Sequence, residues 1–137
     1  MRFPISDVSK MRKLDDKDGP LDGVRRALNP LLEFIESAID SGKNVLIQCK
    51  AGSLHAGACL IAWLMYAEAF SLEEALAEAQ NLRRRIYLNK GLTSWLEVFE
   101  VALEADPEQN FRQQYDAQAD LKAMQQILFR GAGRARV

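Results

Sequence analysis

The residue best placed to do chemistry is Cys49. It follows the apolar run VLIQ and precedes a loop of small residues, KAGSLHAG, which leads into an apolar segment. Successive backbone N–H groups in such a loop can form a nest for an anion, and the positive end of the following helix points at the same place. A cysteine there is favoured as the thiolate, which is its nucleophilic form. The alternative interpretation is a buried core cysteine before an ordinary strand-to-helix turn.

The elements that must position Cys49 are predicted by hydrophobic patterning. Residues 45–49 form a short apolar run that favours a buried strand. Residues 58–70 are apolar on nearly every face, which is typical of a helix in the middle of a fold. Upstream, helical spacing predicts a helix over about 24–40 that ends before Gly42. Asn29-Pro30 interrupts that pattern, so one kinked helix and two abutting helices both remain open.

Further helices are predicted after this unit. Ser71 to Glu74 form a capping box that opens a helix to about Arg84, and a second amphipathic helix runs from Leu92 to Ala105. Residues 106–130 carry a weaker apolar stripe and are predicted to be a helical C-terminal extension, followed by a flexible tail at 131–137.

The N-terminal region is predicted to contain a short strand and a loop instead of a helix. Residues 2–6 favour a short strand, with Pro4 confining it to an edge or a strand end. Residues 7–23 combine aspartates with glycine and proline, which is the composition of a loop.

Length and composition exclude several classes of protein. The chain has 137 residues, 48% of them hydrophobic and 27% charged, which fits one globular domain. A formal net charge of −1 argues against general nucleic-acid binding. The longest strongly apolar stretch is too short to span a bilayer, and the first residues lack the apolar core of a signal peptide. Two cysteines cannot build a disulfide scaffold. We therefore expect a cytoplasmic protein that binds neither nucleic acid nor membrane.

The stretch from Phe34 to Ile86 resembles the heart of a dual-specificity protein phosphatase, in the cysteine-dependent protein tyrosine phosphatase superfamily. The similarity covers roughly residues 1–104. The residues that carry it are Phe34-Ile35, Val45-Leu46-Ile47, Cys49, Ala51-Gly52, Ala62-Trp63-Leu64-Met65, Ser71-Leu72-Glu73-Glu74-Ala75-Leu76 and Arg83-Arg84.

The resemblance implies a role for each position of the loop, but the match is incomplete. In the family, a histidine precedes the nucleophilic cysteine, and an arginine and a hydroxyl residue follow the five intervening residues. Here Cys49 takes the nucleophile position, whereas Gln48, His55 and Ala56 replace those three polar groups. The implied phosphate-binding loop consists of Lys50, Ala51, Gly52, Ser53, Leu54 and His55.

The change to His55 should impair catalysis. A guanidinium offers two phosphate oxygens a planar fork that is always charged, whereas an imidazole is charged only below about pH 6.5. Loss of one preorganised donor costs roughly 10² to 10³ in rate. We expect a weak or inactive phosphatase, in which His55 substitutes in part at low pH. The alternative is that His55 is a solvated loop residue.

The resemblance also implies a general acid, which must be an aspartate on a separate loop. Asp7 is the first candidate because Phe3-Pro4-Ile5-Ser6 matches the family's preceding strand. Residues 8–18 look inserted, so Asp16 and Asp18 fit the family spacing better but lack that flanking match. The alternative is that all of them are solvated loop aspartates.

Two further groups have a plainer interpretation beside the functional one. Arg83, Arg84 and Arg85 resemble the family's arginine pair, but cations at a helix C-terminus are the simpler explanation. Cys59 is expected to be inert packing, with a protective disulfide to Cys49 as the alternative.

We therefore predict a helix-rich α/β protein: a phosphatase-like sheet packed by helices, without its N-terminal strands, in residues 1–105. Its function would be hydrolysis of phosphate monoesters through Cys49, without a metal or organic cofactor, on a phosphoprotein substrate or phosphorylated partner. A pseudophosphatase that binds or scaffolds without turnover is the alternative, and a purely structural helical protein is the third possibility. Two explanations of the short N-terminal side remain open: a partner or a second copy covers it, or the sequence is the later part of a longer gene product.

Overall fold

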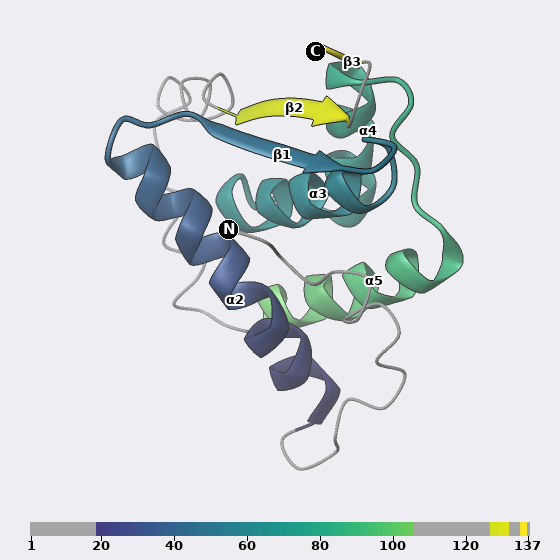
Figure 1. Ribbon diagram of the computed structural model, residues 1–137. Helices are drawn as coiled ribbons and strands as arrows, with labels where there is room; N and C mark the ends of the chain where they lie inside the picture. Colours follow the sequence, from purple (N-terminus) through teal and green to yellow (C-terminus); the bar gives the residue numbers. More distant parts are fainter. Residues whose placement is uncertain (1–18, 106–126, 132–134, 137) are drawn as a thin grey trace.

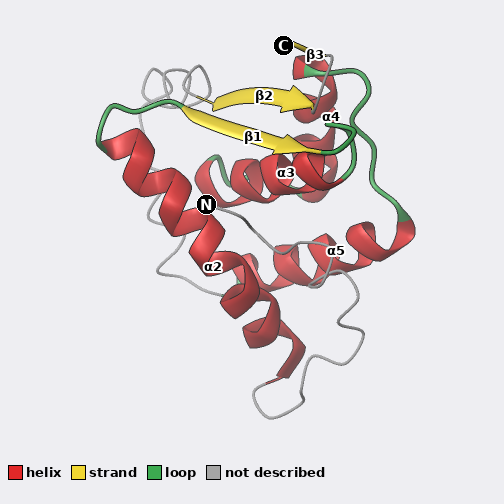
Figure 2. Ribbon diagram, viewed as in Figure 1, coloured by secondary structure: helices red, strands yellow, loops and turns green. Residues whose placement is uncertain are grey.

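The computed structural model describes residues 19–105, 127–131 and 135–136, and it is a helix-rich α/β fold, as predicted (Figure 1). The sheet lies at one side of the helices, and α3 runs directly beneath it (Figure 2). The elements in chain order are α2 (Gly19–Asp40), β1 (Val45–Cys49), α3 (His55–Ala67), α4 (Leu72–Leu82), α5 (Lys90–Glu104), β2 (Ile127–Gly131) and β3 (Ala135–Arg136).

The sheet has the strand order β1-β2-β3. β1 pairs in parallel with β2, with Val45 opposite Ile127 and Cys49 opposite Gly131, and β2 pairs antiparallel with β3. Along β1, Val45 and Ile47 are buried, whereas Leu46 and Gln48 are exposed. Because successive strand side chains point to opposite faces, the helices cover one face of β1 only.

Helix α3 is the centre of the hydrophobic core. Ten of its residues are buried, from Ala56 to Met65, so no face of this helix is left for water. This confirms the interpretation of the apolar segment, although the helix begins earlier and ends earlier than the predicted range of 58–70. Among the described residues, no helix is long and apolar enough to cross a membrane.

Helix α2 passes through Pro30 without a break, so the single-helix alternative is correct. It also begins at Gly19, five residues before the predicted start, and thus takes in the end of the segment that composition assigned to a loop. Pro20 lies in the first turn, where its missing N–H costs no helical hydrogen bond. The helix ends at Asp40, before Gly42 as expected, and Gly42 has a φ of 71° that few other residues adopt readily.

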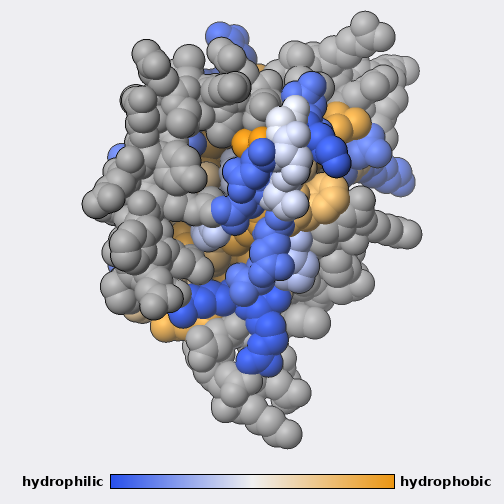
Figure 3. Space-filling model, turned by 90° about the vertical axis from the view of Figure 1, so that its left-hand side faces the viewer, coloured by the Kyte–Doolittle hydropathy of each residue, from blue (hydrophilic) through white to orange (hydrophobic). Residues whose placement is uncertain are grey.

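The outer side of α2 faces solvent. Figure 3 views the molecule from this side and shows a largely hydrophilic band crossing it. On the inner side, Val24, Leu28 and Ile35 are fully buried, and the Arg25 Nη2 donates to the carbonyl of Ala102 on α5. An amphipathic α2 therefore closes the core against α5.

Helices α4 and α5 begin at side-chain caps that the sequence encodes. Ser71 Oγ accepts from the N–H of Glu74 at 3.2 Å, and the Glu74 carboxylate accepts from the N–H of Ser71 at 2.9 Å, which confirms the predicted capping box. Asn89 Oδ1 accepts from the N–H of Leu92 at 2.9 Å and caps α5.

The C-terminal region corrects one prediction. Residues 127–130 belong to strand β2 instead of ending the expected helix, and part of the expected tail, Ala135–Arg136, forms β3. Ile127 and Phe129 are residue types enriched in strands, and pairing with β1 favours the strand here over the helix. The predicted strand at 2–6 and the helix over 106–126 lie outside the described residues.

Candidate active site

Strand β1 delivers Cys49 to the start of a tight loop. The loop runs from Lys50 to Leu54 and connects the carboxyl end of β1 to the first residue of α3, His55. Figure 2 shows it turning sharply between the strand and the helix beneath it. The strand-cysteine-loop-helix arrangement predicted from the sequence is therefore correct.

A backbone N–H points at the sulfur of Cys49. The N–H of Gly52 donates to Cys49 Sγ at 3.1 Å, and the Cys49 side chain is partly exposed. Gly52 has a φ of 68°, which only glycine adopts without strain. The loop therefore needs glycine at this position in order to turn an amide inward, as the nest interpretation of this loop requires.

The N-terminus of α3 opens onto the same loop. Its N-cap residue is Leu54, which makes no side-chain cap hydrogen bond, and the first helical bond runs from the N–H of Ala58 to the carbonyl of Leu54. The leading N–H groups of a helix have no partners inside the helix. An anion beside Cys49 would thus meet the positive end of α3 in addition to the N–H of Gly52.

The segment after α4 supports the loop from outside. The N–H of Tyr87 donates to the carbonyl of Ser53 at 3.3 Å. Ile86 packs against the first turn of α3 at Gly57 so closely that a Cβ there would lie 2.8 Å from Ile86 Cγ2. The loop is thus held by the core on one side and by residues 86–87 on the other.

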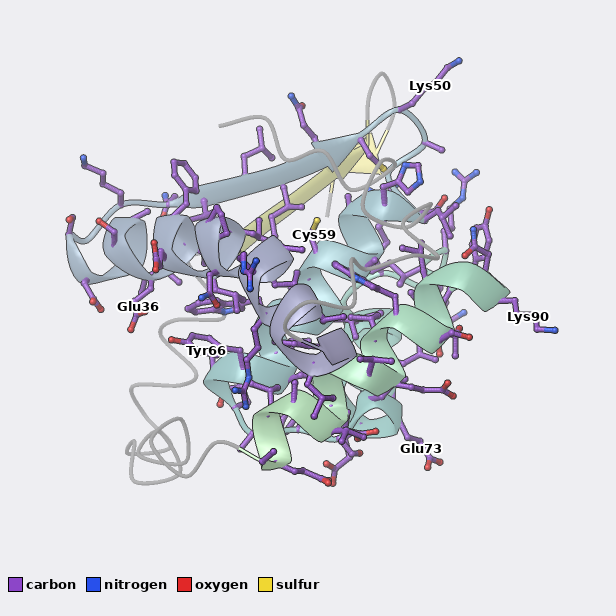
Figure 4. All side chains as sticks on the ribbon, turned by 90° about the horizontal axis from the view of Figure 1, so that it is seen from below. Glu36, Lys50, Cys59, Tyr66, Glu73 and Lys90 are labelled. Carbon is purple, nitrogen blue, oxygen red and sulfur yellow. The ribbon has the colours of Figure 1, made fainter. Side chains whose placement is uncertain are left out.

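The predicted loop residues differ in their exposure. Lys50 and Ala51 are exposed, Gly52 is buried, and Ser53, Leu54 and His55 are intermediate. In Figure 4 the Lys50 side chain points away from the fold. Of the two residues at the altered family positions, His55 keeps access to solvent, whereas Ala56 is buried and contributes no polar group.

Cys59 lies inside the fold and is chemically unlike Cys49. It is 6% exposed, and Figure 4 shows its sulfur in the interior, on the helix side of β1. Burial, and to a lesser extent the electrostatic effect of Cys49, raise the pKa of the Cys59 thiol to about 12. A thiol that resists ionisation is a poor nucleophile, so Cys59 acts as packing.

The three arginines after α4 do not form one group. The helix ends at Leu82; Arg83 is its C-cap and only 8% exposed, whereas Arg84 and Arg85 are exposed. All three arginines follow the C-terminus of α4, as the simpler explanation has it, but Arg83 is buried there. The turn that follows is closed by the N–H of Ile86, which donates to the carbonyl of Arg83.

The candidate general acids Asp7, Asp16 and Asp18 lie outside the described residues. Within the described part of the chain, no group of three or more His, Cys, Asp or Glu side chains is placed to hold a metal ion.

Sequence reasoning missed the residues that support the loop, namely Ile86 and Tyr87. They lie 37 and 38 positions after Cys49, and no local pattern connects them to it. The only signal in the sequence was an apolar residue followed by an aromatic residue shortly after the end of α4.

Comparison with known proteins agrees with this geometry. Residues 5–102 match the model of the family described as "Dual specificity phosphatase, catalytic domain". The chain is 36% identical over 72 residues to human protein phosphatase Slingshot homolog 3, covering 53% of this chain and 11% of that protein. It is 31% identical over 88 residues to human dual specificity phosphatase 28, covering 64% and 50%.

A third relative is the mouse serine/threonine/tyrosine-interacting protein, 30% identical over 87 residues, covering 64% of this chain and 39% of the relative. The matched segments thus span half or less of these relatives. No solved structure matches the chain. The family match covers most of the sequence, including β1, the loop and helices α3 to α5, and the chain belongs to the dual specificity phosphatase family.

Proposed function

We propose that the loop of residues 50–55 binds the phosphate group of a phosphoprotein and that Cys49 is the nucleophile toward it. The observation that carries this proposal is the N–H of Gly52 directed at Cys49 Sγ at 3.1 Å, at the uncapped N-terminus of α3. The inward N–H of Gly52 and the helix N-terminus both favour negative charge at this place. The family membership supplies the class of substrate.

In the proposed reaction, the Cys49 thiolate attacks phosphorus and a phosphorus–sulfur bond forms as the phosphorus–oxygen bond to the phenol or alcohol breaks. The leaving oxygen takes a proton from a general acid, for which Asp7, Asp16 and Asp18 are the candidates. Water then attacks the phosphocysteine, releasing inorganic phosphate and restoring the thiolate. No metal or organic cofactor takes part in this proposal.

Turnover by the natural sequence should be weak or absent. His55 cannot present the two-pronged, permanently charged donor that an arginine offers to phosphate oxygens. Ala56 is 2% exposed and has no hydroxyl, so it cannot assist the departure of the Cys49 thiolate from phosphorus. Phosphoryl transfer depends mostly on positioning and charge stabilisation, and both are reduced here.

The second candidate is a pseudophosphatase, a module that binds a phosphorylated partner without turnover. The replacement of both groups at positions 55 and 56, with the loop and Cys49 retained, favours it. One matched relative is also named for interaction and not for phosphatase activity.

The decisive experiment is a double substitution. We expect little hydrolysis of p-nitrophenyl phosphate by the natural sequence and a gain of at least about 10²-fold in His55→Arg with Ala56→Ser, because a charged donor and a hydroxyl are restored. Cys49→Ser in the same background should abolish the gain. If the double variant stays inactive but both proteins bind orthovanadate, the pseudophosphatase is correct. If neither protein binds orthovanadate, phosphate or sulfate, the loop is purely structural.

A further inference from the structure

Gln80 makes a contact that its position on the surface does not predict. It lies near the end of α4 and is exposed as a residue, yet its Nε2 donates to the carbonyl of Ile86 at 3.1 Å. Ile86 is 1% exposed, so this bond reaches from a surface helix to the backbone of a buried residue.

The peptide unit that receives this bond also donates one. Its carbonyl belongs to Ile86 and accepts from Gln80, while its N–H belongs to Tyr87 and donates to the carbonyl of Ser53 at 3.3 Å. A hydrogen-bonded series therefore runs from the Gln80 side chain through the Ile86–Tyr87 peptide to the candidate active-site loop. Hydrogen bonds in series polarise and strengthen one another.

The series ends on the peptide unit between Ser53 and Leu54. The carbonyl of Ser53 and the N–H of Leu54 belong to one planar peptide, and the described residues contain no cis peptide bonds. In a trans peptide the N–H points opposite to the carbonyl. The bond from Tyr87 therefore fixes the N–H of Leu54 to point away from residues 86–87.

We propose that Gln80 is a positioning residue for the anion-binding loop. Through the Ile86–Tyr87 peptide it sets the orientation of the Ser53–Leu54 peptide, so that the N–H of Leu54 donates to the bound oxyanion alongside the N–H of Gly52. The inference rests on the proposed function, because it needs an anion at the loop. No residue of α4 is proposed to contact the anion, so α4 would contribute to binding indirectly, through Gln80.

The test compares removal of the Gln80 donor with a matched change beside it. Gln80→Leu and Gln80→Met both remove the donor without adding charge. The control is Asn81→Leu, which removes an amide on the same helix whose Nδ2 donates to Glu78 Oε2 at 3.4 Å and does not extend to the loop. The dissociation constant for sulfate and for orthovanadate is measured by calorimetry on the full chain, together with the melting temperature without anion.

We expect both Gln80 variants to bind each anion about three- to tenfold more weakly, which is the effect of losing about one net hydrogen bond. Their melting temperatures should stay close to that of Asn81→Leu, whose anion affinity should equal that of the natural sequence. Amide exchange at Tyr87 should also be faster in the Gln80 variants only.

Three results would overturn the inference. Unchanged anion affinity in both Gln80 variants leaves the proposed function standing and removes Gln80 from it. Weaker binding that Asn81→Leu shares, or that is explained by unfolding at the assay temperature, reduces Gln80 to a structural residue. Failure of the natural sequence to bind either anion contradicts the proposed function itself, and the positioning role falls with it.

Discussion

Ile86 lies against Gly57 with no space for a side chain between them. A Cβ at position 57 would be 2.8 Å from Ile86 Cγ2 and 3.4 Å from Ile86 Cγ1. Because Ile86 is β-branched and fully buried, its Cγ2 cannot rotate away at low cost. This contact fixes the segment after α4 against the first turn of α3, next to the loop that holds Cys49.

Gly57→Ala should therefore destabilise the protein, although alanine favours helices. Overpacking costs about 1–3 kcal/mol, against a gain in helix propensity of up to about 1 kcal/mol. The matched control is Gly91→Ala, an exposed position in α5 where only the helix propensity acts and the change should stabilise. Urea unfolding gives the change in unfolding free energy for each variant. A change of the same sign in both variants would contradict the packing argument.

Gly52→Ala and Gly42→Ala should cost similar stability but differ at the site. Both glycines have positive φ, 68° and 71°, so alanine costs about 1–2 kcal/mol at either position. A Cβ at Gly42 meets nothing within 4 Å, and Gly42 precedes β1 whereas Cys49 lies at the opposite, carboxyl end of that strand. Only Gly52→Ala disturbs the N–H directed at Cys49 Sγ. We expect slower alkylation of Cys49 by iodoacetamide, and weaker sulfate binding, in Gly52→Ala alone. If Cys49 reacted equally fast in both variants, the N–H of Gly52 would have no effect on the reactivity of Cys49.

Stability should fall at high pH through Cys59. Its pKa rises from 9.0 to about 12 on folding, so folding favours the protonated thiol. The associated stability is complete below pH 9 and is lost as the pH rises toward 12. Between pH 8 and pH 10 the unfolding free energy should fall by about 1 kcal/mol through this group, by linkage. Cys59→Ala should show a correspondingly smaller decrease in unfolding free energy over that interval. If the unfolding free energy of the two proteins fell equally over this interval, the pKa of Cys59 would be the same in the folded and the unfolded chain.

Sulfate binding should strengthen when position 55 carries a permanent cation. His55→Arg places a planar, always charged donor at the first residue of α3, so this variant should bind sulfate more tightly than the natural sequence. His55→Gln is the matched control, because it keeps a polar side chain at the same position without adding charge. Calorimetry on the three proteins gives the dissociation constants. Equal affinity of all three proteins for sulfate would identify His55 as a solvated loop residue.

Local signals predicted much of this fold from the sequence. The strand Val45–Cys49 has the predicted bounds, and the Ser71 capping box begins α4 as expected, because both depend on residues adjacent in the chain. β2 was predicted as helix because its conformation depends on pairing with a strand some eighty residues earlier. Composition at 19–23 indicated a loop, whereas packing of the amphipathic helix that follows extends α2 through it.

The site was predictable only in part, for the same reason. The cysteine, the small-residue loop and the helix are contiguous, so their arrangement follows from the sequence. The contacts Gly57–Ile86, Ser53–Tyr87 and Gln80–Ile86 join separate elements or the segments between them, and they are visible only once the chain is folded.

Because α3 fills the middle of the core, we expect the loop at its N-terminus to melt together with the rest of the fold. We expect the amide hydrogens of α3 to exchange mainly through global opening, so that the loop persists for as long as the molecule stays folded. Binding of any anion at the loop would then stabilise the whole folded protein. A ligand at a concentration one hundred times its dissociation constant would add about 2.7 kcal/mol to the free energy of unfolding. A simple heat-denaturation screen of phosphorylated compounds would therefore report on this loop whether or not the protein turns anything over.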